Sequence, residues 1–260
     1  MSKPIAIGIC LSPDKVAQLA PGFDYVELAL AATLNPLADD AAYAPQQPAL
    51  AALRPPVRAF NIFVPREVKV VGPEVDWALV ERYVERALRR AASLGADVIV
   101  FGSGGARRVP EDYPTALAWG QLVRFLNLCA DYAANQAITI AIEPLNKGEC
   151  NIINSYLEGV QLAKDVGRRE VRVLADIYHF MMEGEPVDDI AKEPEWLAHV
   201  HLSDTDHYWP GSGTYPLERL FAILKELNYQ GMASIECRWG PDFTEETARS
   251  LRFLRGLAEG

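Results

Sequence analysis

The sequence lacks the residue patterns of several protein classes. It has only four cysteines in 260 residues, and they lie far apart with no CxxC pair. This spacing favours reduced thiols in small core positions over a disulfide framework or a structural zinc site. No run of lysine or arginine exceeds two residues, and the formal net charge is -10 at pH 7. Because nucleic-acid binding requires a clustered basic surface, we expect no nucleic-acid partner.

Long hydrophobic runs are also absent. No apolar stretch approaches the roughly 20 residues that cross a bilayer, and the first run, "IAIGICL", is too short for a secretory signal. We therefore expect a cytoplasmic protein without a membrane partner. Hydrophobic residues make up 50% of the chain, which is enough for a full core, and no linker or low-complexity tract divides it. We predict one domain over residues 1–260.

Short β-branched apolar runs alternate with longer segments of helical spacing. This alternation is typical of βα units that build a parallel sheet. Two of the longer segments, residues 75–95 and 114–136, carry apolar residues three and four positions apart and are predicted helices. The strand candidates are residues 5–11, 25–30, 57–64, 96–102, 138–145, 171–179, 197–204 and 232–239.

Eight βα units in about 260 residues match a single (β/α)8 TIM barrel of the α/β class. A doubly wound open sheet is the alternative, but it would normally have a glycine-rich phosphate loop after its first strand, and "ICLSPDKV" has none. The Ala/Pro-rich residues 31–56 are interpreted as a long second loop and a helix rather than a domain boundary.

Polar residues end four consecutive predicted strands: Glu143, Asp176, His201 and Glu236. The C-terminal ends of barrel strands form the active face, so these side chains should converge there. Buried carboxylates are costly unless they are paired or bind a metal. This oxygen-rich set with one imidazole suits one divalent ion, with Mn²⁺ the first choice and Mg²⁺, Co²⁺ or Zn²⁺ as alternatives.

Three of the four histidines fall within "HVHLSDTDHYWPGSG". In an extended strand His199 and His201 point to the same face. His201, nearer the C-terminal end, is placed to reach the metal. His199 should lie one layer deeper, as a hydrogen-bonded core residue.

From "IAIEPLNKGECNIINS" to "SIECRW" the chain resembles the xylose isomerase-like TIM barrels, the sugar isomerases and epimerases that include ketohexose 3-epimerases and hydroxypyruvate isomerase. The resemblance implies a small-molecule sugar or sugar phosphate as substrate and Glu143, Asp176, His201 and Glu236 as the metal ligands. It implies that the metal stabilises an enediolate, while Glu143 and Glu236 act as catalytic acid and base on opposite faces of the reacting carbon.

The resemblance also implies substrate-binding residues. Glu149 and His179 stand where the epimerases contact their substrate, and His207 stands where they usually carry arginine. Histidine cannot make a bidentate clamp, so this departure predicts a different terminal group on the substrate.

Further substrate contacts are predicted from the runs after strands three and four. Asn61 and either Arg107 or Arg108, in "GSGGARR", are candidates to bind a hydroxyl, carboxylate or phosphate. Glu27 is expected either to bind a sugar hydroxyl or to form a salt bridge in the barrel floor.

Three other functions compete with an isomerase or epimerase. A lyase on a keto-sugar or keto-inositol would use the same metal and the same proton abstraction. An endonuclease IV-like phosphodiesterase would need many more histidines than the four present. A non-catalytic sugar-binding barrel is disfavoured because both glutamates are retained. A homo-oligomer is possible on the resemblance, although no stretch of sequence places an interface.

Overall fold

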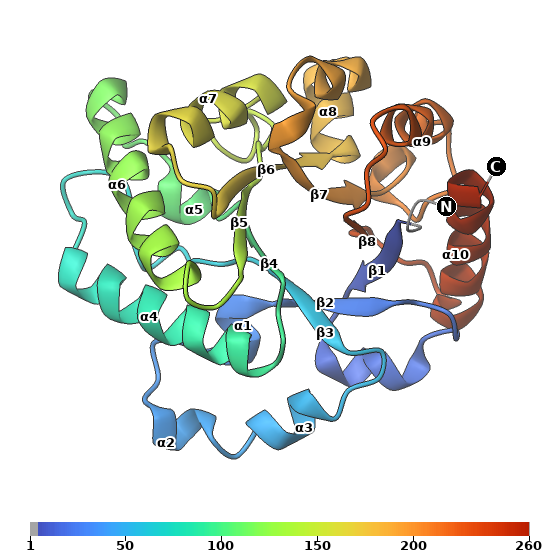
Figure 1. The fold of residues 1–260 in the computed structure, drawn as a ribbon, viewed down its shortest axis with the longest axis horizontal. Helices are drawn as coiled ribbons and strands as arrows, with labels where there is room; N and C mark the ends of the chain where they lie inside the picture. Colours follow the sequence, from blue (N-terminus) through green and yellow to red (C-terminus); the bar gives the residue numbers. More distant parts are fainter. Residues whose placement is uncertain (1–4, 260) are drawn as a thin grey trace.

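A computed structural model describes residues 5–259. Eight parallel strands form a closed barrel in the order β1 to β8, with β8 paired to β1 (Figure 1). This confirms the predicted single (β/α)8 barrel and excludes the doubly wound sheet. The strands are β1 (Ala6–Cys10), β2 (Tyr25–Ala29), β3 (Val57–Asn61), β4 (Val98–Phe101), β5 (Thr139–Ile142), β6 (Val171–Asp176), β7 (Leu197–Leu202) and β8 (Met232–Ile235).

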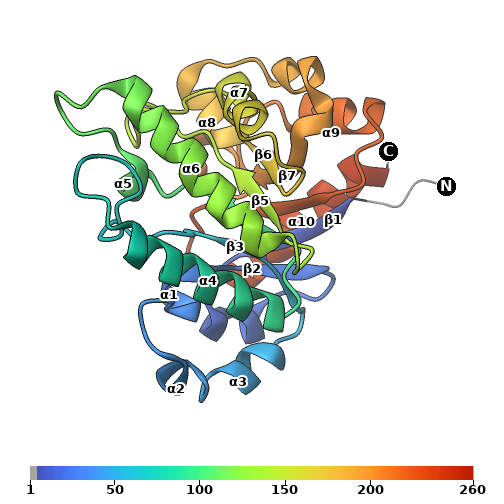
Figure 2. The same cartoon turned by 60° about the vertical axis from the view of Figure 1, so that its left-hand side comes forward.

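Helices surround the strands, and the view from the side shows α4 and α6 packed next to each other (Figure 2). The α-helices are α1 (Leu30–Leu34), α2 (Asp40–Tyr43), α3 (Gln47–Ala51), α4 (Trp77–Ser93), α5 (Gly104–Arg107), α6 (Thr115–Ala133), α7 (Tyr156–Val166), α8 (Ile177–Glu183), α9 (Leu217–Glu226) and α10 (Phe243–Glu259). Short 3₁₀ segments are η1 (Pro13–Gln18), η2 (Val187–Lys192), η3 (Pro194–Trp196) and η4 (Thr205–His207). No helix within residues 5–259 is long and apolar enough to cross a membrane.

The two longest predicted helices are confirmed as α4 and α6. Helix α4 begins where the Asp76 carboxylate accepts hydrogen bonds from the backbone N–H groups of Ala78 and Leu79. This side-chain cap satisfies donors that the first helical turn leaves free. Helix α6 follows Pro114, which fixes the backbone just before the first turn.

Several element bounds differ from the prediction: β3, β5 and β8 end at Asn61, Ile142 and Ile235 rather than at residues 64, 145 and 239. Residues 31–56 contain α2, α3 and most of α1, three short helices rather than one longer helix after a loop. The sixth strand ends at Asp176, not at residue 179, because the Asp176 carboxylate accepts a hydrogen bond from the Tyr178 N–H and starts α8. This cap holds Asp176 at the C-terminal rim of the barrel, and the residues that follow form α8.

The barrel interior changes from apolar to charged toward the C-terminal ends of the strands. Its apolar part is a cluster of inward side chains from six strands, among them Tyr25, Val100 and Leu174. Gly8 leaves room for Tyr25, because a Cβ there would lie 2.2 Å from the phenol ring. The Tyr25 hydroxyl then hydrogen-bonds Ser234 at 2.7 Å, where the charged layer begins.

Candidate metal centre and active site

A buried network around Glu27 forms the floor of the site. One carboxylate oxygen lies 2.8 Å from His199 Nε2 and accepts a hydrogen bond from the Ser234 hydroxyl at 2.6 Å. The other lies 3.0 Å from His201 Nε2. Burial favours the neutral form of Glu27, but the facing His201 and His199 imidazoles hold its pKa well below the usual range. Of the two roles predicted for Glu27, the structure supports the floor ion pair, and His199 is a core histidine as expected.

The four predicted metal ligands come together directly above this floor. Glu143 and Glu236 each lie one residue beyond a strand, and their backbone N–H groups continue the barrel hydrogen bonding to Phe101 and Leu202. Asp176 and His201 are paired neighbours on β6 and β7. One donor atom from each of the four side chains lies within 4.8 Å of the others.

The donor atoms surround one edge of the His201 imidazole. His201 Nδ1 lies 2.6 Å from Glu236 Oε2, 3.1 Å from Glu143 Oε1 and 3.9 Å from Asp176 Oδ2. Because Glu27 occupies Nε2, a proton on Nε2 would leave the Nδ1 lone pair directed at three carboxylates. Such a set is repulsive without a cation between the donors, and it therefore fits a divalent ion.

The charges of the cluster support the same interpretation. In residues 5–259 no lysine or arginine forms an ion pair with Glu143, Asp176 or Glu236. Burial raises the pKa of Asp176 to about 6 and also raises that of Glu143. Burial opposes charge on His201, yet Glu236 and Glu27 raise the pKa of its imidazole well above the usual value. The carboxylates thus draw a positive charge onto the imidazole that they surround.

A polar cavity of about 470 Å³ opens above the cluster. Asn61 lines it and donates a hydrogen bond from Nδ2 to Glu236 Oε1 at 2.8 Å. His179 lines it too, with Nε2 at 3.7 Å from Asp176 Oδ2, while its Nδ1 accepts from the Asn146 N–H at 3.1 Å. Asn146 Nδ2 donates to Glu149, which also lines the cavity. Three predicted substrate-binding residues therefore lie around one space.

His207 completes the cavity from the loop after β7. Its ring stacks on Tyr178, with centroids 4.2 Å apart and planes 12° from parallel. Its backbone has a φ of +64°, and its carbonyl accepts a hydrogen bond from the Arg238 N–H at 2.7 Å. The buried Nε2 has no hydrogen-bond partner among the described residues. The stacked ring thus forms part of the cavity wall, while its Nε2 is enclosed within the protein.

Arg107 does not take the predicted position. Its side chain is fully buried, and the guanidinium donates to the backbone carbonyls of Phe101 and Glu143 at 2.8 and 2.7 Å. It does not line the cavity, so the structure corrects the prediction that it contacts substrate. Its two terminal guanidinium nitrogens instead hydrogen-bond the backbone at the ends of β4 and β5 and so fix the backbone of Glu143. Its neighbour Arg108 is exposed and donates to the Glu149 carbonyl. Arg66, which lines the cavity, was not predicted because it lies within the loop after β3, which carries no motif.

Gly102 is a second residue that the sequence analysis missed. A Cβ at this position would lie 2.0 Å from Glu143 Oε2, so only glycine leaves space for the carboxylate in this position. Gly102 follows β4 directly and is the first glycine of "VFGSGG". A glycine at the end of a barrel strand was the signal from which this close approach could have been predicted.

The family model described as xylose isomerase-like TIM barrel matches residues 13–257. The chain belongs to this family. Within it, the chain is 30% identical over 235 residues to the D-psicose 3-epimerase of Agrobacterium fabrum, a match that covers 86% of this chain and 77% of that enzyme. The resemblance inferred from the sequence is confirmed, and the chain is an enzyme of the sugar isomerase and epimerase type.

Solved structures of other proteins share the fold. The apo 3-keto-D-glucoside 4-epimerase of E. coli superposes with a TM-score of 0.80 at 22% identity, over 97% of this chain and 99% of that one. The IOLI protein, whose structure holds a zinc atom, superposes with a TM-score of 0.75 at 16% identity, over 98% of both chains. At these identities the two structures establish the common barrel alone.

Proposed function

We propose that this protein is a divalent-metal-dependent sugar epimerase or isomerase that moves a proton on a carbon beside a carbonyl. The observation that carries the proposal is the group of three carboxylates around one imidazole nitrogen, at the base of a polar cavity and without a lysine or arginine partner among the described residues. The named activity of the psicose epimerase relative supports the same reaction class.

The residues that would hold the metal are Glu143, Asp176, His201 and Glu236. The zinc atom in the IOLI structure supports a divalent ion in this family, and three oxygen donors beside one nitrogen favour Mn²⁺ as the native ion. When bound, the ion would act as a Lewis acid that acidifies the proton beside the substrate carbonyl.

Glu143 and Glu236 would exchange the proton with the substrate. They approach from β5 and β8, so one carboxylate can remove a proton and the other can return one. Return to the same carbon from the other face gives an epimer, whereas return to the neighbouring carbon interconverts an aldose and a ketose. Asn61 orients Glu236 by its hydrogen bond, and Arg107 fixes the backbone of Glu143.

The substrate would be a small keto-sugar bound by the polar wall of the cavity. His179 and Glu149 offer a ring N–H and a carboxylate to hydroxyl groups, and the His207 ring lines the same space. Side chains that are neutral or carry a single charge suit hydroxyl groups, which both donate and accept hydrogen bonds at neutral pH.

The test is proton exchange followed by NMR. The protein with Mn²⁺ is incubated in D₂O with a panel of ketoses, keto-acids, keto-inositols and 3-keto-glucosides. Deuterium beside a carbonyl, lost on chelation, is the expected result, and the product distinguishes epimerase, isomerase and lyase. An eliminated β-substituent would replace the proposal with the lyase alternative. The absence of exchange with every compound, from protein that has bound Mn²⁺, would contradict it.

A further inference from the structure

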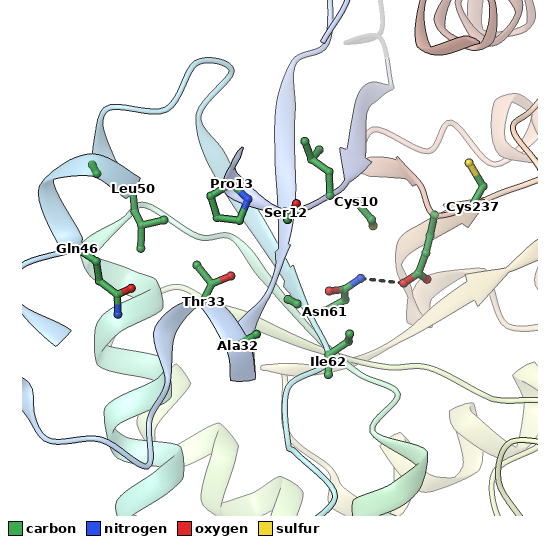
Figure 3. A pocket seen from close by; sticks show the side chains of 14 residues that line it. Cys10, Ser12, Pro13, Ala32, Thr33, Gln46, Leu50, Asn61, Ile62 and Cys237 are labelled. Carbon is green, nitrogen blue, oxygen red and sulfur yellow. Dashed lines mark hydrogen bonds between the residues drawn. The ribbon is translucent and has the colours of Figure 1, made fainter. Parts of the chain in front are cut away.

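Figure 3 shows a second cavity, of about 630 Å³. It shares the lining residues Asn61, Ile62 and Glu236 with the polar cavity, so the two adjoin beside the carboxylate cluster. We call the second cavity the side chamber. It is formed by the end of β1, the segment around α1, and α3.

The side chamber is apolar and nearly uncharged. Most of its wall is apolar, with Leu11, Ala32, Ala49 and Leu50 among its aliphatic residues, and the one ionisable carboxylate among its lining residues is the shared Glu236. Its neutral polar side chains are Ser12, Thr33, Gln46 and the shared Asn61. A free ketose has an oxygen on every carbon, and these few polar side chains would leave many of its hydroxyls without the partners they have in water. A phosphate would be disfavoured further, since no lysine or arginine of residues 5–259 lines the chamber.

The cysteines provide part of this apolar wall. Cys10 and Cys237 line the chamber and are partly exposed, whereas Cys129 and Cys150 are buried as predicted for core thiols. A neutral thiol behaves as a small hydrophobic group, so both residues extend the apolar wall without adding charge.

Ile62 stands at the boundary of the two cavities with an unusual backbone. It is 53% exposed and has a φ of +45°, a conformation that β-branched residues rarely adopt. Its carbonyl accepts a hydrogen bond from the Ala31 N–H at 3.2 Å, which ties it to the start of α1. Strain of this kind persists where the surroundings hold it, and it clusters at ligand sites. The strained backbone presents an aliphatic side chain to the junction.

The two cavities together leave room for a ligand larger than a monosaccharide. The polar cavity alone, at about 470 Å³, lies within the approximately 300–1,000 Å³ of complete small-molecule sites. The side chamber is larger and more apolar. A plain monosaccharide would leave it filled with poorly bonded water.

We propose that the substrates of this enzyme are keto-sugars with an apolar substituent, such as an aryl or alkyl aglycone, which the side chamber binds while the keto-sugar lies over the carboxylate cluster. The inference rests on the proposed function, because it takes the reacting sugar to occupy the polar cavity. The continuity of the two cavities at Glu236 and Asn61 selects this occupant over a separate ligand.

The test compares phenyl and methyl glycosides. Deuterium exchange is measured on phenyl and methyl 3-keto-β-D-glucopyranoside, and binding of the unreactive phenyl and methyl β-D-glucopyranosides to Mn²⁺-loaded protein is measured by calorimetry. Burial of a phenyl ring predicts a preference of about tenfold to a hundredfold for the phenyl compound, in kcat/KM and in dissociation constant.

Variants on α3 provide a matched pair. Ala49 lines the chamber and Ala51 does not, and both are exposed on the same short helix. Ala49→Trp is expected to reduce the phenyl preference to about twofold or less, because the indole would fill the space of the phenyl ring. Ala51→Trp is expected to retain the preference.

The outcomes separate this inference from the proposed function. Exchange on both substrates without a phenyl preference, or a preference that survives in Ala49→Trp, would overturn the side chamber as a substituent site and leave the epimerase proposal intact. A phenyl preference in calorimetry that Ala49→Trp removes would support the chamber even if neither keto-glucoside exchanged deuterium, and that absence of exchange would count against the proposed reaction.

Discussion

The two edges of the His201 imidazole lie in opposite electrostatic surroundings. At Nε2, one carboxylate, Glu27, is shared with a second imidazole, His199, and with a hydroxyl. At Nδ1, three carboxylates face one nitrogen. The first edge is close to charge balance and the second is not. The floor therefore positions the ring, whereas the excess of negative charge at the upper edge suits an added cation.

The largest effect is expected from removing the proton-transfer groups at the unbalanced edge. Glu143→Gln or Glu236→Gln should lower deuterium exchange by about 10³-fold or more, because an amide keeps an oxygen but cannot take up a proton. NMR of the exchanging substrate measures the loss, and circular dichroism checks that the barrel is retained.

The matched control is Glu111→Gln, since Glu111 is exposed in the loop before α6. It should exchange at the wild-type rate. Wild-type exchange in either site variant would refute the assignment of two bases.

A smaller effect is expected from displacing one carboxylate without removing it. Gly102→Ala puts a methyl group where Glu143 Oε2 lies, and a shift of the reacting group by about 1 Å can cost about 10² in rate. Steady-state kinetics measures kcat. Gly120→Ala on α6 is the control, because a Cβ there meets nothing within 4 Å. Equal activities of the two variants would show that Glu143 tolerates displacement.

The barrel and the four converging residues could be predicted from the sequence because each depends on a local pattern. Alternating strands and helices fix the closed sheet, and polar residues at the ends of four strands must share its rim. Glu143, Asp176, His201 and Glu236 were found in this way, and the structure brings their side chains together.

The predictions for Arg107 and for the end of β6 were wrong because both depend on side-chain direction and hydrogen bonding. Arg107 follows a glycine-rich loop as an anion-binding residue would, yet its guanidinium turns inward to two carbonyls. The end of β6 was extended to His179 because apolar residues continue past Asp176, and the capping hydrogen bond to Tyr178 stops the strand. Neither the cap nor the inward turn leaves a periodic signal in the sequence.

The smallest expected effect concerns the balanced edge. Glu27→Gln removes the charge that holds the His201 ring by Nε2, and loss of such a supporting partner typically weakens metal binding by about 10- to 100-fold. Calorimetric titration with Mn²⁺ gives the dissociation constant, with Glu111→Gln again as the control. An unchanged constant would mean that Glu27 has no part in orienting His201.

Metal content is the most direct test of the central claim that the unbalanced edge of His201 holds one divalent ion. The protein is stripped with a chelator, dialysed against MnCl₂, freed of unbound ion and analysed by elemental mass spectrometry, alongside Asp176→Asn. The account predicts about one Mn²⁺ per wild-type chain and a clearly lower content in the variant. Wild-type protein that retains no divalent ion under these conditions would contradict it.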